Sequence, residues 1–240
     1  MQSSGSLMTM EENKKMEKCS ECEGQKKKSL SLLTRESVPY ASHYCEENTY
    51  KLIEILFENY TVSDQDVFAV FVSNREKKTP VWMQRLGRNE ENDNIDTKNP
   101  LVWDYHVFVL VITTTGRKLV FDYDSILPFP SLAEEYVMKA FRPYMQLREE
   151  YQQWFRVIPG RLYLDYFSSD RSHMDTSDIP PPPWPLIRGK LAVKEMQLPL
   201  YWDMLPVVEG KESGDNSSFL GKVMNIAEFT SFVGLSRKKG

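Results

Sequence analysis

Two β-rich runs joined by a short turn restrict the fold of this chain more than any other feature. The runs LVWDYHVFVLVITTT (101–115) and KLVFDYDSI (118–126) are rich in β-branched and aromatic residues, and Gly116 lies between them. Such runs around a glycine predict an antiparallel hairpin. The chain therefore has to contain an antiparallel sheet, and the side chains on one face of the hairpin become near neighbours.

Helical patterns flank the predicted hairpin on both sides. In residues 45–60, apolar side chains recur at steps of three and four, which predicts an amphipathic helix with one buried stripe. Further helices are predicted at 132–141 and 226–234, strands at 67–74, 80–86 and the end of 151–158, and a loop at 87–100. This mixture predicts an α+β fold in which an antiparallel sheet packs on helices.

Composition divides the 240-residue chain into a polar tail and one domain. Residues 1–39 contain no aromatic residue, so we expect them to form a disordered tail, and we expect residues 40–240 to form a single domain. The net charge is −4, and no basic stripe is present, which argues against nucleic acid as a partner. No apolar run reaches the length of a membrane-spanning helix, so no membrane association is expected.

Cysteine usage indicates a reducing compartment. The chain has 3 cysteines, too few for a disulfide scaffold, and its N-terminus lacks the apolar stretch of a secretory signal. We therefore expect the protein in the cytoplasm or the nucleus.

Cys45 lies at the start of the predicted helix 45–60, followed by two acidic residues. A helix N-terminus favours an anion, so this position predicts a thiol of lowered pKa that could act as a nucleophile. The N–H groups of the first turn could then hold a developing oxyanion. The alternative interpretation is a small buried apolar residue, as free cysteines often are.

His106 lies within the first strand of the predicted hairpin. If residues 114–116 form a three-residue loop, His106 lies opposite Asp124, and Asp122 is its diagonal neighbour on the same face. Either carboxylate could fix the histidine tautomer and stabilise the imidazolium form, and the hairpin pattern does not choose between them. The alternative is a core histidine bonded to a backbone carbonyl.

Several longer motifs resemble one enzyme family. In chain order they are YCEEN (44–48), FAVFVSN (68–74), VWDYHV (102–107), FDYDSILPFP (121–130), FRVIP (155–159), SDRSHM (169–174) and PPPPWP (180–185). Over about residues 40–235 the chain is similar to the protein N-terminal glutamine amidohydrolase family. The tail 1–39 has no clear counterpart in that resemblance.

The resemblance implies a catalytic triad of Cys45, His106 and Asp122 on a papain-like or transglutaminase-like core. It implies a monomer that deamidates the N-terminal glutamine of proteins or peptides and releases ammonia. It also implies a place in the N-degron pathway, in which the glutamate product becomes a substrate for arginylation. The thiol chemistry requires no metal and no organic cofactor.

Selection of an N-terminal glutamine requires recognition of the free α-ammonium group. A buried cation needs a counter-charge or several acceptors. The candidate carboxylates are Glu46, Glu47, Asp104 and Asp170. His173 could line the same pocket, although a structural histidine is the favoured interpretation.

Three alternatives remain open at the level of sequence. The same triad would serve a protease or a transglutaminase, which differ only in pocket and acceptor. Cys19 and Cys22, together with His43 and Cys45, offer four ligands for a zinc ion in a binding module. The PPPPWP run could bind an SH3 or WW domain, or pack as an ordered loop.

Overall fold

The computed structural model describes residues 27–87, 95–175, 177, 179–204 and 217–235. Its centre is a six-stranded sheet with the strand order β10-β7-β1-β4-β5-β6, in which every neighbouring pair is antiparallel. The strands of this sheet are β1 (Val67–Ser73), β4 (Tyr105–Ile112), β5 (Lys118–Phe121), β6 (Ser131–Leu132), β7 (Trp154–Pro159) and β10 (Lys222–Asn225). Two small ribbons lie outside it, formed by β2 (Thr79–Val81) with β3 (Leu101–Trp103) and by β8 (Ser168–Ser169) with β9 (Ile187–Arg188).

The predicted hairpin is formed by β4 and β5. Val109 pairs with Phe121 and Ile112 with Lys118, so the three-residue loop and the predicted register are confirmed. Pairing ends at Phe121, however, and the prediction of a strand through residue 126 is wrong. The reason is local, because the side chain of Asp122 accepts a hydrogen bond from the backbone N–H of Asp124 at 3.0 Å and turns the chain away from β4.

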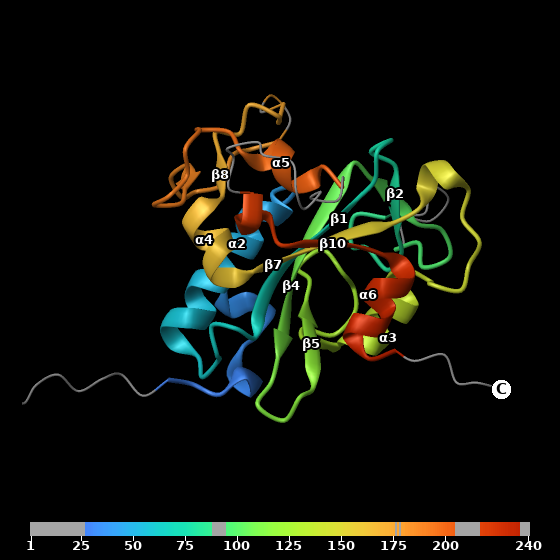
Figure 1. Cartoon of the computed structure of the whole chain (residues 1–240), viewed down its shortest axis with the longest axis horizontal. Coiled ribbons are helices and arrows are strands. Elements are labelled where there is room, and N and C mark those ends of the chain that lie inside the picture. The colour runs from blue at the N-terminus through green and yellow to red at the C-terminus, as the bar shows by residue number, and fades with distance from the viewer. Residues whose placement is uncertain (1–26, 88–94, 176, 178, 205–216, 236–240) are drawn as a thin grey trace, which may run out of the picture.

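Helices cover both faces of the sheet (Figure 1). They are α2 (Cys45–Asn59), α3 (Ala133–Ala140), α4 (Gly160–Tyr166), α5 (Leu198–Trp202) and α6 (Ile226–Val233), with 3₁₀ turns at Leu30–Leu32, Arg35–Ser37, Glu149–Tyr151 and Ser217–Leu220. The helices predicted at 45–60, 132–141 and 226–234 are confirmed within two residues. Helix α6 begins with a capping box of Asn225 and Glu228 and ends at Gly234, whose φ is 95°.

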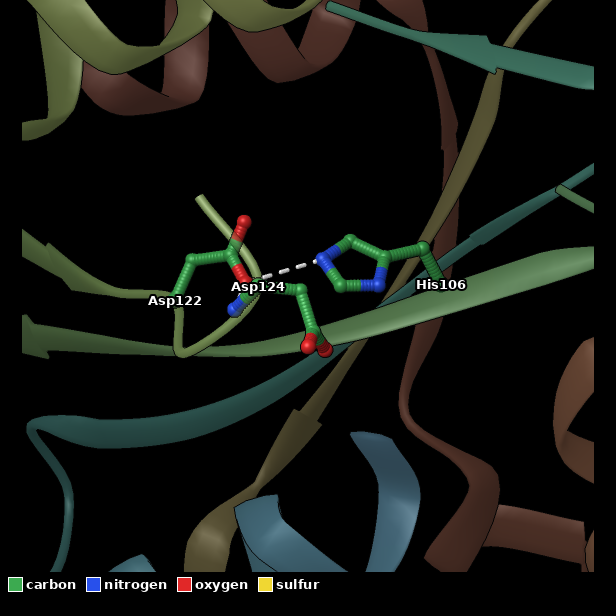
Figure 2. Close-up of side chains that lie close together, drawn as sticks. All are labelled: His106, Asp122 and Asp124. Carbon is green, nitrogen blue, oxygen red and sulfur yellow. Dashed lines mark hydrogen bonds and ion pairs between the residues drawn. The ribbon is translucent and has the colours of Figure 1, made fainter. Parts of the chain in front are cut away.

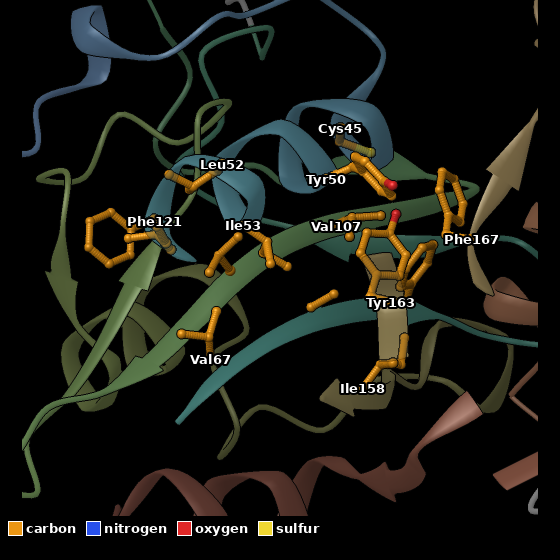
Figure 3. Packing of buried hydrophobic residues seen from close by; sticks show 14 of the residues in the cluster. Cys45, Tyr50, Leu52, Ile53, Val67, Val107, Phe121, Ile158, Tyr163 and Phe167 are labelled. Carbon is orange, nitrogen blue, oxygen red and sulfur yellow. The ribbon is translucent and has the colours of Figure 1, made fainter. Parts of the chain in front are cut away.

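Alternate residues of each strand face two different hydrophobic clusters. Phe71 and Val107 point toward the cluster that contains α2, α4 and α5, of which Figure 3 shows a part. Val72 and Phe108 point toward the other cluster, which contains α3 and α6. The chain is thus a mixed α+β protein with helices packed on both faces of an antiparallel sheet, as the patterns predicted.

The structure corrects two further boundaries. The predicted strand 80–86 ends at Val81, and the residues after it leave the ribbon. The described part of the expected tail, residues 27–39, packs on the domain, because Leu33 and Val38 are buried in the core cluster. Burial of these two apolar side chains anchors an otherwise polar segment on the domain. Residues 1–26, and residues 88–94 of the predicted loop 87–100, lie outside the described residues.

No helix within the described ranges is long and apolar enough to cross a membrane.

Candidate active site

The site begins at the N-terminus of α2, where the chain turns sharply before the helix. His43 adopts a φ of 70°, and the side chain of Asn48 closes the turn by bonding both the N–H and the carbonyl of Ala41, at 2.8 and 2.7 Å. Tyr44 is the N-cap residue, so Cys45 is the first residue of the helix, as predicted. The first N–H groups of a helix have no partner inside it, and those of α2 therefore point out beside Cys45.

Cys45 is buried at the edge of the core that Figure 3 shows. Its thiol donates to Glu46 Oε2 over 3.7 Å, and the backbone of Val107 on β4 bonds the sulfur. Burial, followed by the charges of Glu46 and Asp124, raises the pKa of Cys45 well above its usual value. The expected lowering of this pKa by the helix N-terminus is therefore wrong, because desolvation and two carboxylates outweigh the helix dipole. The resting group is a thiol that needs a base.

His106 lies at the start of β4 with its ring fully buried and paired with Asp122 (Figure 2). Nε2 is 3.0 Å from Asp122 Oδ1, and Trp103 stacks on the ring at 5.4 Å between centroids. Burial alone lowers the pKa of His106, but the charge and hydrogen bonding of Asp122 outweigh it, and the net shift is upward. The proton therefore resides on Nε2, and the lone pair of the neutral ring is on Nδ1.

Asp122 rather than Asp124 is the partner of His106. Asp122 Oδ2 accepts the hydroxyl of Tyr136 at 2.7 Å, while Asp124 Oδ1 accepts the hydroxyl of Tyr40 at 2.6 Å. Burial raises the pKa of Asp122, but His106 and the bonds from Tyr136 and the Asp124 amide lower it more, and the net shift is downward. The choice that the hairpin pattern left open is thus made by tertiary contacts.

Cys45 and His106 are close in the fold but not bonded to each other. The sulfur contacts Val107, the next residue along β4, while β5 pairs with β4 only from Val109 onward and leaves the strand edge at His106 open. The charges of Asp124 and Glu46 act on both the thiol and the imidazole. By hydrogen-bond geometry neither buried ring nitrogen of His106 has a partner among the described residues, but Nε2 forms the ion pair with Asp122, whereas Nδ1 has no recorded partner. Catalytic hydrogen bonds of this kind often form only when substrate is bound.

Comparisons with known proteins place the chain in one enzyme family. The family model of N-terminal glutamine amidase matches residues 40–233. The chain belongs to the N-terminal glutamine amidase family. It is 42% identical over 152 residues to a protein N-terminal glutamine amidohydrolase of Danio rerio, which covers 62% of this chain and 71% of the relative. Identity to the enzyme of that name from Homo sapiens is 38% over 157 residues, covering 64% and 73% of the two chains.

The structure separates the four carboxylates that sequence analysis proposed for substrate binding in this amidase family member. Both carboxylate oxygens of Glu47 already accept hydrogen bonds. Arg171 donates to each of them at 2.8 Å, and the indole of Trp184 donates to Oε2 at 2.7 Å. Asp104 is exposed and accepts the backbone N–H of Tyr105. Asp170 accepts the N–H of Ser172. Only Glu46 lies beside Cys45.

Potential metal ligands converge at one place within the described ranges. One ligand atom each of His106, Asp122 and Asp124 lies within 4.8 Å of the others. The ion pair with Asp122 engages Nε2, and hydrogen bonds engage both carboxylates, which fits a proton-handling cluster. Of the alternative zinc set, the side chain of His43 is exposed and that of Cys45 is buried. Cys19 and Cys22 lie outside the described residues, so this alternative stays a prediction.

Sequence analysis missed three residues of this site. Tyr136 supports Asp122 from α3, Tyr105 donates to Glu46 Oε2 at 3.0 Å, and Arg35 donates to the carbonyls of Asp122, Ser125 and Leu127. Strand alternation gave a signal for Tyr105, because it has to face away from His106 and toward α2. Nothing in the local pattern distinguished Tyr136, and Arg35 belonged to a segment expected to be disordered.

Proposed function

We propose that this chain hydrolyses the side-chain amide of an N-terminal glutamine, leaving N-terminal glutamate and releasing ammonia. The family match over residues 40–233 and the names of its relatives support this activity. One structural observation carries the assignment of roles. The buried His106 is held by Asp122 through Nε2, while its Nδ1 has no recorded partner. The next residue along the strand, Val107, contacts Cys45 at the start of α2.

The first half of the reaction forms a thioester. Nδ1 of His106 takes the proton of the Cys45 thiol, and the thiolate attacks the carboxamide carbon of the glutamine. The N–H groups at the start of α2 receive the negative charge of the tetrahedral oxyanion. His106 then returns the proton to the leaving nitrogen, the C–N bond breaks, and ammonia departs. Asp122 keeps the Nε2 proton in place and stabilises the imidazolium throughout.

The second half regenerates the enzyme. Neutral His106 takes a proton from water, and the hydroxide attacks the γ-glutamyl thioester. The carbon–sulfur bond breaks, the Cys45 thiolate recovers a proton from His106, and the product is N-terminal glutamate. Because the pKa of the Cys45 thiol is high at rest, the proton transfer to His106 belongs to the reaction and is not completed beforehand.

The peptide beyond the glutamine is assigned to a pocket next to the segment that leads into Cys45. A pocket of about 380 Å³ is lined by residues 40–43 and by Ile179, Pro180, Pro181 and Pro183. The first of these segments leads directly into Cys45 along the chain. The proline run thus forms one wall of the pocket, and we assign to it the residues that follow the N-terminal glutamine.

The proposal also includes the type of core, the oligomeric state, the compartment and the pathway. A cysteine at a helix start, packed on a strand that carries the histidine, with the aspartate just after the neighbouring strand, supports a papain-like or transglutaminase-like core. We further propose that the protein acts as a monomer in the cytoplasm or nucleus, and that its glutamate products enter the arginylation branch of the N-degron pathway.

The decisive experiment measures ammonia from two peptides. One peptide starts with glutamine, and the other carries the same glutamine behind an acetylated N-terminus. We expect ammonia from the first alone, without peptide cleavage or crosslinking, and a fall of roughly 10⁴-fold or more in Cys45→Ala. The variant must retain the wild-type melting temperature for this comparison.

Two outcomes would contradict the proposal. Ammonia from both peptides would indicate a general glutaminase or a transglutaminase. Absence of ammonia from both peptides with folded wild-type protein would exclude the amidase activity.

A further inference from the structure

Glu46 is a buried carboxylate that the proposed chemistry does not use. Its side chain is fully buried, yet among the described residues Oε1 has no hydrogen-bond partner. The nearest polar atom recorded for Oε1 is Nε2 of His173 at 3.7 Å, which is beyond hydrogen-bond length. Buried polar atoms in native proteins are almost always bonded, so an open carboxylate oxygen here indicates a place prepared for a donor.

The surroundings of Glu46 suit a small cation. Oε2 accepts the hydroxyl of Tyr105 at 3.0 Å and the Cys45 thiol at 3.7 Å, which fixes the carboxyl group and directs Oε1 away from these donors. Burial lowers the pKa of His173 below its usual value, so at neutral pH its ring carries no charge and does not repel a cation. The Oε1 atom of Glu46 is therefore available to accept a hydrogen bond from a bound cation.

The neighbouring carboxylate provides an internal comparison. Glu47 is the next residue of the same helix turn and is equally buried, but Arg171 and Trp184 occupy both its oxygens. A single turn of α2 thus holds Glu47, which is paired with the guanidinium of Arg171, and Glu46, which has no such partner among the described residues. The ion pairs recorded among the described residues give Glu46 no arginine or lysine partner.

We propose that Glu46 binds the α-ammonium group of the substrate and so restricts the enzyme to glutamine at an N-terminus. This inference rests on the proposed function, since it assigns the specificity of the same site. Glu46 is a specificity residue in this assignment, and Cys45, His106 and Asp122 carry out the bond changes.

The dimensions of glutamine agree with this assignment. Four bonds separate the α-nitrogen from the carboxamide carbon, which places them about 5 Å apart in an extended side chain. A reacting carbon lies roughly 3 to 3.5 Å from its nucleophile before attack. Because Glu46 Oε2 is 3.7 Å from the Cys45 sulfur, one extended glutamine reaches both groups.

Proton balance removes the objection that an unpaired buried charge is costly. Burial raises the pKa of Glu46 to about 8, so the empty site holds a neutral acid at pH 7. A peptide α-amino group has a pKa of about 8 as well. An amine and an acid of matched pKa exchange a proton at almost no cost, so the ion pair forms only when the substrate is present.

The test compares a glutamine peptide with the same peptide in which hydrogen replaces the α-amino group. With wild-type enzyme we expect kcat/KM to be about 100-fold higher for the amine. In Glu46→Gln we expect this ratio to collapse toward one, chiefly through a higher KM for the amine. If Glu46 had only a structural role, Glu46→Gln would lower kcat/KM equally for both peptides and would leave their ratio unchanged. That result would overturn the inference.

Glu47→Gln is the matched control, because it removes a carboxylate one residue away on the same turn. We expect Glu47→Gln to destabilise the loop around Arg171, because it removes the ion pair of that arginine. The variant should change kcat/KM for both peptides by the same factor. Should Glu46→Gln not fold, calorimetric binding of both peptides to Cys45→Ala decides instead, and equal affinities would overturn the inference.

The proposed function is tested separately from this inference. It fails if wild-type enzyme releases no ammonia from the glutamine peptide. If wild-type enzyme is active but does not discriminate between the two peptides, the function stands and the role of Glu46 is refuted.

Discussion

Asp122 and Glu46 are both buried carboxylates near the same histidine, yet their surroundings have opposite effects. Asp122 lies in a turn after β5 and receives bonds from His106, Tyr136 and the Asp124 amide, which together lower its pKa despite burial. Glu46 lies at the start of α2 with one open oxygen, and burial raises its pKa to about 8. Burial alone therefore does not set the charge of an acid. Asp122 faces the imidazole of His106, whose charge favours the ionised form, whereas Glu46 lies beside Glu47, whose charge raises its pKa further.

The comparison assigns different tasks to the two regions. A carboxylate that stays ionised can hold an imidazolium during each catalytic cycle, which is the requirement at Asp122. An acid that is neutral when the site is empty avoids the free-energy cost of an unpaired buried charge and ionises only when a cation binds. This is the requirement at Glu46. One site thus contains a permanent anion for catalysis and a conditional anion for recognition.

The largest effect is expected at the catalytic carboxylate. Asp122→Asn keeps the shape of the side chain but removes the charge, so kcat should fall by roughly 10²- to 10⁴-fold. The pKa of His106 should also fall, because the anion that raises it is gone, and the acid limb of the pH–rate profile should move to lower pH. Steady-state kinetics from pH 5 to 9 measure both changes.

Asp124→Asn is the control for that substitution. It lies in the same turn but bonds Tyr40 instead of the histidine, and we expect a loss of about 10-fold or less. An equal loss in the two variants would mean that the assignment of Asp122 as the partner of His106 has no kinetic basis.

The second effect concerns stability. The pKa of Glu46 is raised from 4.5 to about 8 in the folded state, so between these values the folded state binds more protons than the unfolded state. Its contribution is fully present below about pH 4.5 and is lost as pH rises to about 8. Relative to wild type, Glu46→Gln should therefore gain about 3 to 5 kcal/mol of unfolding free energy between pH 4 and pH 9.

Urea unfolding of both proteins at several pH values measures this difference. The variant and the wild type share every other titrating group, so the difference isolates Glu46. A difference that stays constant with pH would show that Glu46 titrates with the same pKa in the folded and unfolded states, which would refute the upward shift that burial causes.

The smallest effects are expected from the two tyrosines that support these acids. Tyr136→Phe removes one of several donors to Asp122, and Tyr105→Phe removes the hydroxyl that holds Glu46 Oε2. Each loss is worth about 1 kcal/mol, or roughly 5-fold. The first should lower kcat and leave the preference for the α-amine unchanged, whereas the second should reduce that preference. The reverse pattern would interchange the roles of the two regions.

Local patterns in the sequence determined a large part of this protein. The hairpin loop at 114–116 fixed the register in which β5 pairs with β4, and the capping box at Asn225 fixed the start of α6. The helix that begins at Cys45 followed from apolar spacing alone. These features depend on residues within a few positions of one another, which is why they can be read before the fold is known.

Tertiary structure decided the properties of the site. Tyr136 and the turn after β5 selected Asp122, Arg171 from a distant loop neutralised Glu47 and left Glu46 open, and burial reversed the expected pKa shift of Cys45. All of these depend on desolvation and on donors brought in from far along the chain. Spacing in a sequence reveals which residues share a face, but the charge of a buried group follows from every atom that the fold places around it.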